Sequence, residues 1–142
     1  MDGGLFSVSK DCAAEVIYEG KVYTYNSSGR MTVATNVSAT AYAVAICSSY
    51  KANGDAKTMT AGEGHPFAML GSNMLVHCYS ANSATYAVGA AVYLDAVDGA
   101  VSTATTTGTV CIGTYEGIDD LVTTAVGDLV AVRLDRAPGA TA

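Results

Sequence analysis

Apolar and polar residues alternate along most of this chain in short runs. In the run 129–135, Val130, Val132 and Leu134 fall on one side of an extended backbone, and the residues between them fall on the other. This two-residue repeat is typical of a β-strand with one buried face. Similar runs recur along the chain, at residues 14–18, 21–25, 31–35, 42–48, 56–60, 74–79, 90–95 and 109–115.

Turn-forming residues separate these runs. Clusters rich in Gly, Asn, Asp and Ser favour tight turns, and they occupy residues 19–20, 26–29, 53–55, 62–66, 71–73 and 97–99. Short strands about 8 to 12 residues apart, with turns between them, predict an all-β fold that is either a small β-barrel or a β-sandwich. The one place where we expect a short helix is residues 117–125.

A weak internal repeat links two parts of the chain. Residues 21–46 read KVYTYNSSGRM and later AVAI, whereas residues 91–112 read AVYLDAVDGAV and later TVCI. In both parts a Gly follows the Val of a Val-Tyr pair by seven residues, from Val22 to Gly29 and from Val92 to Gly99. We interpret the repeat as two similar hairpins in one barrel or sandwich, each with a Gly at a backbone angle that a side chain would oppose.

The length of 142 residues suits a single domain. We expect an N-terminal arm at residues 1–12, one β domain at 13–136 and a flexible tail at 137–142. The arm carries three large apolar side chains, Leu5, Phe6 and Val8. Such a segment either adds as a strand to the sheet edge of a neighbouring molecule or forms the first strand of the domain's own sheet, and the sequence leaves both alternatives open.

The small number of charged residues limits the kinds of molecule that we expect as binding partners. Only 14% of the residues are charged, the net charge is −6, and the seven Lys and Arg residues do not cluster. We therefore expect no direct contact with nucleic acid and a weakly polar surface that suits packing against other proteins. The long uncharged stretches at 31–50 and 64–94 are interrupted by Thr, Ser, Asn or Gly, so we expect no membrane span, and no secretory leader is visible.

Residues with the chemistry for metal binding or catalysis are scattered. The cysteines form no CxxC pair, so we expect buried free thiols, with structural disulfides as the alternative. A metal site from His65, His77 and Cys78 is disfavoured, because adjacent residues on a strand point to opposite faces. The four cysteines are Cys12, Cys47, Cys78 and Cys111.

The acidic residues and the tyrosines do not indicate a catalytic or ligand-binding site. Acids in turns usually cap the backbone, and their spacing matches no calcium-binding loop; these are Asp95, Asp98, Glu116, Asp119 and Asp120. Most of the nine tyrosines lie in strand runs, where aromatic pairs stabilise sheets. With no catalytic motif in the sequence, we expect a protein that is not an enzyme and that uses no cofactor or metal.

The segment 88–135 resembles small head-decoration (cement) proteins of tailed bacterial and archaeal viruses. These proteins often run from a strand through a Gly turn and an Ile-Gly strand to a Gly-Asp turn and a last strand of the form V-x-V-x-L. The corresponding residues are 92–94, Gly99, 112–113, 127–128 and 130–134. The sequence departs from this pattern before Val92, where it reads Val-Gly-Ala-Ala, and residues 56–79 have no counterpart.

The resemblance implies a small, β-tulip-like all-β domain with an extended N-terminal arm. It also implies a homo-oligomer, a trimer in many such proteins, that binds the major capsid protein lattice on the capsid exterior after synthesis in the host cytoplasm. Leu5, Phe6 and Val8 would then be capsid-contact residues of the arm. Clamping adjacent capsid subunits needs no chemistry, because many weak contacts add over one shell.

Two other functions stay open. One is a different self-assembling structural subunit, such as a component of a tail tube, fibre or surface layer. The other is a carbohydrate-binding module that uses surface tyrosines.

Overall fold

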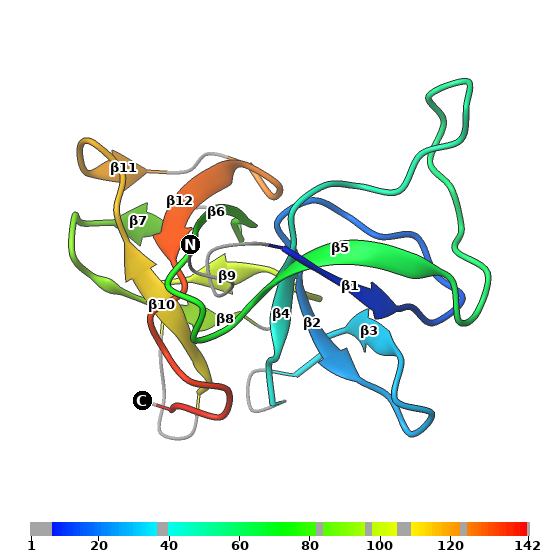
Figure 1. Ribbon diagram of the computed structural model, residues 1–142. Coiled ribbons are helices and arrows are strands. Elements are labelled where there is room, and N and C mark those ends of the chain that lie inside the picture. Colours follow the sequence, from blue (N-terminus) through cyan, green and yellow to red (C-terminus); the bar gives the residue numbers. More distant parts are fainter. Residues whose placement is uncertain are drawn as a thin grey trace.

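The computed structural model describes residues 7–36, 40–81, 84–95, 98–104, 109–122 and 125–141. Over these residues the protein consists of β-strands in antiparallel sheets and contains no helix, which confirms the predicted all-β class. In Figure 1 the strands of the first half of the chain lie on the right, and those of the second half lie on the left.

The first sheet has five strands in the order β1-β5-β4-β2-β3. Neighbouring strands pair antiparallel throughout, with Val22 opposite Val44 and Val44 opposite Ala68. The strands are β1 (Val8–Asp11), β2 (Val22–Tyr25), β3 (Met31–Val33), β4 (Ala43–Ala45) and β5 (Gly64–Met69).

The second sheet has five strands in the order β6-β12-β10-β8-β9, and β7 and β11 form a separate two-stranded ribbon. All these pairings are antiparallel. The strands are β6 (Leu75–Tyr79), β7 (Thr85–Tyr86), β8 (Ala91–Leu94), β9 (Val101–Ser102), β10 (Cys111–Tyr115), β11 (Leu121–Val122) and β12 (Leu129–Arg133).

The two five-stranded sheets have the same topology. Without β7 and β11, each half of the chain places its first strand at an edge, followed by its fifth, fourth, second and third strands. The weak repeat in the sequence therefore belongs to a duplication of the whole sheet, with β2 matching β8 and β4 matching β10. The two similar hairpins that we expected lie in different sheets.

The duplication extends to the segments between strands. In the second half, the segment after the first strand pairs with the segment after the fourth strand, as β7 with β11. In the first half, the same two segments meet at a single antiparallel bridge between Val16 and Thr58. The ribbon is thus a longer version of a contact that both halves make.

Both sheets contribute to one shared core. The matched residues Val22 and Val92 both belong to it, as do Val44 of β4 and Ile112 of β10. Alternate residues of the first sheet face the other way, into a smaller core that includes Tyr23. The segments 12–20 and 46–63 cover this second core and bury Ile17 and Met59 within it. Alternation along each strand therefore decides which of two cores a residue enters.

Two glycines join the sheets reciprocally. The Gly20 carbonyl, in the first half, accepts a hydrogen bond of 2.8 Å from the Tyr79 N–H on β6. In return, Gly99 of the second half accepts from the Val22 N–H at 2.9 Å and donates to the Ala34 carbonyl at 2.7 Å. Both glycines have positive φ, 81° and 69°, which disfavours any residue with a side chain.

The two ends of the chain lie against the sheets where they are described. Val8–Asp11 of the expected arm form β1, which pairs with β5 in the molecule's own sheet; residues 1–6 lie outside the described part of the chain. At the other end, in the expected flexible tail, the Ala140 carbonyl accepts from the Cys111 N–H at 2.8 Å, and Thr141 bridges to Val110.

The helix expected at residues 117–125 is wrong. Where this segment is described it contains strand β11, whose Leu121 pairs with Tyr86 on β7. The Tyr115 hydroxyl donates to the Asp119 carbonyl at 2.7 Å and the Tyr115 side chain lies against Gly117, where the chain bends before β11. The partner strand is 35 positions away in sequence, so a local pattern could not reveal the pairing.

We predict that Gly20→Ala destabilises the protein more than Gly29→Ala does. Both positions have positive φ, which costs an Ala residue roughly 1 kcal/mol. A Cβ at Gly20 would lie 2.6 Å from the Tyr79 backbone nitrogen, whereas Gly29 has nothing within 4 Å. Overpacking adds about 1 to 3 kcal/mol at Gly20 alone. Urea unfolding of both variants measures the difference in the free energy of unfolding. Equal losses of stability would contradict the close approach of Gly20 to the Tyr79 backbone.

Candidate functional site

Cys47 and His65 bring a thiol and an imidazole close together. The Sγ of Cys47 lies 3.6 Å from the Nε2 of His65, and this nitrogen is 2.8 Å from the Cys47 carbonyl oxygen. A carbonyl only accepts hydrogen bonds, so Nε2 carries the proton and donates it there. His65 therefore has no free lone pair at Nε2 to remove the thiol proton. Burial also raises the pKa of Cys47, which keeps the thiol protonated.

The other predicted metal ligands do not converge. His77 is exposed on one face of β6, while Cys78 is fully buried on the other, as the strand geometry predicts. His65 lies on β5 of the other sheet. Among the described residues, no group of three or more His, Cys, Asp or Glu side chains is placed to hold a metal ion.

All four cysteines are free thiols, as expected from their spacing. Burial raises the pKa of Cys78 to about 12 and that of Cys12 to about 11. Cys111 is also buried, and its pKa is raised by the same cause. These side chains behave as small apolar core residues.

The acidic residues act locally. Glu116 forms an ion pair with Arg133, at 2.7 Å from Oε2 to Nε. The Asp120 carboxylate accepts from the Val88 N–H at 2.9 Å, and Asp95 accepts from the Ser102 hydroxyl at 2.8 Å. Asp98 is exposed beside a hollow that Glu15 also lines. The contact of Asp120 is the expected backbone cap, whereas Glu116 and Asp95 contact the side chains of Arg133 and Ser102.

The tyrosines divide into buried and exposed groups. Tyr86 is fully buried, its hydroxyl donates to the Val101 carbonyl at 3.0 Å, and burial raises its pKa to about 12. On the surface, the Lys21 ammonium lies over the rings of Tyr18 and Tyr79, 4.5 and 4.9 Å from their centroids. A cation therefore already occupies the faces of these two rings, and a sugar would have to displace it.

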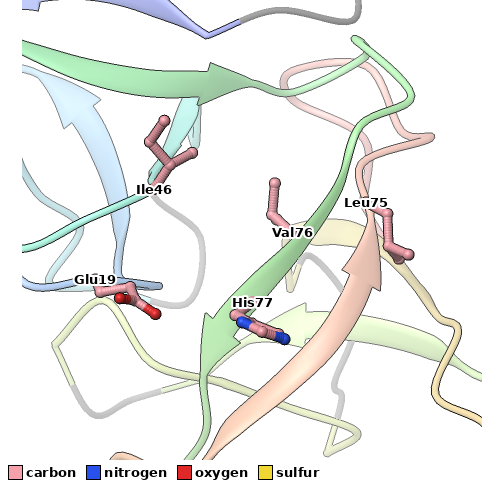
Figure 2. A pocket seen from close by; sticks show the side chains of 5 residues that line it. All are labelled: Glu19, Ile46, Leu75, Val76 and His77. Atoms are coloured by element: carbon pink, nitrogen blue, oxygen red, sulfur yellow. The ribbon is translucent and has the colours of Figure 1, made fainter.

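A surface hollow of about 190 Å³ lies where the two sheets meet. Figure 2 shows Ile46 and Glu19 of the first half across the hollow from β6, where Val76 lies, whereas the His77 ring and the Leu75 side chain extend to the other side of that strand. The lining combines apolar side chains with one carboxylate and one imidazole. It has the size of a single side chain, and the groups required for a reaction are not gathered there.

The largest group of exposed apolar side chains lies on the β7–β11 ribbon and its turns. Ile118 is 98% exposed, Val122 62% and Val88 52%, and Leu121 is also exposed. Sequence reasoning missed these residues, because it assigned residues 117–125 to a short helix. The sequence did contain a signal for these residues. The segment 116–122 combines apolar side chains with acidic ones and contains no Lys or Arg.

Of the predicted arm contacts, Val8 is exposed on the edge strand β1. Leu5 and Phe6 lie outside the residues that the structure describes. No helix in the described part of the chain is both long enough and apolar enough to cross a bilayer.

Comparisons with protein families, curated proteins and solved structures found no match to this chain. Its function must therefore be inferred from its own surface and fold.

The raised thiol pKa values predict that the protein loses stability in alkaline solution. Thiols ionise near pH 9 in the unfolded chain but remain protonated in the folded protein, so their contribution is complete below pH 9 and falls as the pH rises toward 12. Each such thiol contributes about 1.4 kcal/mol per pH unit within this window.

Cys78→Ala should reduce that slope, because it removes the thiol whose pKa burial raises to about 12. Urea unfolding at several pH values between 8 and 10.5 gives the slope for both proteins. Both proteins contain the same Lys and Tyr residues, so the titration of these groups does not contribute to the difference between the two slopes. Parallel curves over the whole range would contradict the assignment of a buried, protonated Cys78.

Proposed function

We propose that the protein is a structural virion protein that decorates an icosahedral capsid and stabilises it by clamping adjacent major capsid subunits. The observation that carries this proposal is the concentration of exposed apolar side chains on the β7–β11 ribbon. Exposed apolar groups gathered in one place are typical of protein contact sites, and a protein that clamps subunits needs such a site.

The rest of the surface supports the same function. Charged residues are few, so a close contact with another protein would require little removal of water from charged groups. Each such contact is weak, but many copies on one shell stabilise the assembled form through mass action and multivalency.

The positions of the residues that carry the resemblance to head-decoration proteins support the proposal. Residues 92–94 lie in β8, Gly113 in β10 and residues 130–133 in β12, and Gly127 with Asp128 forms the turn before the last strand. We propose accordingly that the two sheets act as a β-sandwich. The protein would work as a homo-oligomer, in trimers, on the capsid exterior.

The N-terminal arm remains part of the proposal. Val8 is the first residue of β1, which is an edge strand. We propose that Leu5, Phe6 and Val8 are residues of the arm that contact the capsid lattice.

Binding to undecorated shells tests this function. We expect saturable co-sedimentation of the purified protein with the shells and a rise in the temperature at which the shells lose integrity. Shells that neither bind the protein nor gain heat resistance would reject the proposal.

Electron microscopy of the protein alone tests the alternative of another self-assembling subunit. Ordered filaments or sheets in the absence of shells would favour a tail-tube, fibre or surface-layer component. Specific binding on a glycan array would favour the carbohydrate-binding alternative.

A further inference from the structure

The β7–β11 ribbon presents apolar side chains that the fold leaves in contact with water. We use the name ribbon surface for Val88, Ile118 and Val122. Leu121, the strand neighbour of Val122, points to the opposite face of β11. The two segments are held together, because Leu121 pairs with Tyr86 and the Val88 N–H donates to the Asp120 carboxylate. The three side chains therefore lie on a single small structural unit.

The matching contact in the first half exposes a polar residue. There the two linking segments meet at Val16, which is half-buried, and Thr58, which is exposed. Both contacts also have a buried side, with Ile17 and Met59 in the first half and Tyr86 in the ribbon. The ribbon differs because its exposed side carries the apolar Val122, which is 62% exposed.

The ribbon is firmly anchored despite its exposure. Tyr86 is fully buried and its hydroxyl bonds to Ser80 at 2.8 Å and to the Val101 carbonyl at 3.0 Å. The Tyr86 and Tyr115 rings lie 5.5 Å apart between centroids, and the Tyr115 hydroxyl holds the Asp119 carbonyl. A surface fixed in this way pays little conformational entropy on binding.

The charged residues around the ribbon indicate which side chains a partner would need. Glu116, Asp119 and Asp120 lie within or beside it, and the sequence contains no Lys or Arg from residue 58 to residue 132. Arg133 reaches Glu116 from β12, which leaves the ribbon with a negative border. A complementary surface has apolar residues at its centre and Lys or Arg at its rim.

We propose that the ribbon surface is the face by which this protein docks onto the capsid protein, at an apolar patch bordered by Lys or Arg. This inference rests on the proposed function and specifies which surface of the protein contacts the capsid protein. The ribbon surface of a second copy is a poorer occupant, because it would bring the same negative border against this one; the proposed trimer therefore uses other surfaces.

Two aspartate substitutions test the assignment with undecorated shells as the probe. Ile118→Asp changes a side chain that is 98% exposed, and the control Tyr50→Asp changes one that is 63% exposed in the segment between β4 and β5. Both sites face water, so thermal unfolding should be close to that of the parent. We expect Ile118→Asp to weaken shell binding at least ten-fold, while Tyr50→Asp leaves it unchanged.

Charge reversal and salt provide a second readout. Asp119→Lys should also weaken shell binding, and parental binding should weaken between 50 and 200 mM salt, because the complementary charges are partly screened. If neither the substitution nor the added salt weakens binding, the partner does not carry a rim of Lys or Arg, and that part of the proposal is wrong.

The outcomes separate this inference from the function on which it rests. If the parent binds shells and Ile118→Asp binds equally well, the docking face lies elsewhere and the proposed function stands. If the parent does not bind shells at all, the proposed function fails and the assignment fails with it. If the parent alone self-associates and Ile118→Asp abolishes that association, the occupant is a second copy and the assignment to the capsid protein is overturned.

Discussion

The reciprocal crossing of Gly20 and Gly99 is the constraint on which the rest of the structure depends. Each half of the chain forms a sheet, and each lends one glycine to hydrogen bonds with the other sheet. A Cβ at Gly20 would lie 2.6 Å from the Tyr79 nitrogen, and one at Gly99 would lie 2.7 Å from a methyl carbon of Val33. The missing side chains thus let two similar sheets approach closely enough to share one core.

This arrangement also separates the packed cores from the exposed ribbon. The shared core and the smaller core hold the large apolar side chains of both sheets, and Cys78 and Cys12 are buried within them. The ribbon is anchored to the shared core through Tyr86 and Tyr115. Its exposed residues therefore lie outside the packing that holds the fold together.

The duplication shows where the two halves differ. Matched linking segments lie at matched places in the topology, but in the first half they close over the outer face of the first sheet, around Tyr23 and Phe67. In the second half they form the two-stranded ribbon of β7 and β11.

The sequence by itself determined the all-β class, the strand at residues 129–133, the free thiols and the opposite orientations of His77 and Cys78, because each follows from local alternation or spacing. It also contained the repeat of Val22 with Gly29 and of Val92 with Gly99. Only the tertiary structure decided that β1 joins the molecule's own sheet, that the repeat is a duplicated sheet, and that residues 121–122 form a strand instead of a helix. These features depend on hydrogen bonds between residues far apart in the chain, and such pairings leave no periodic trace in either partner's sequence.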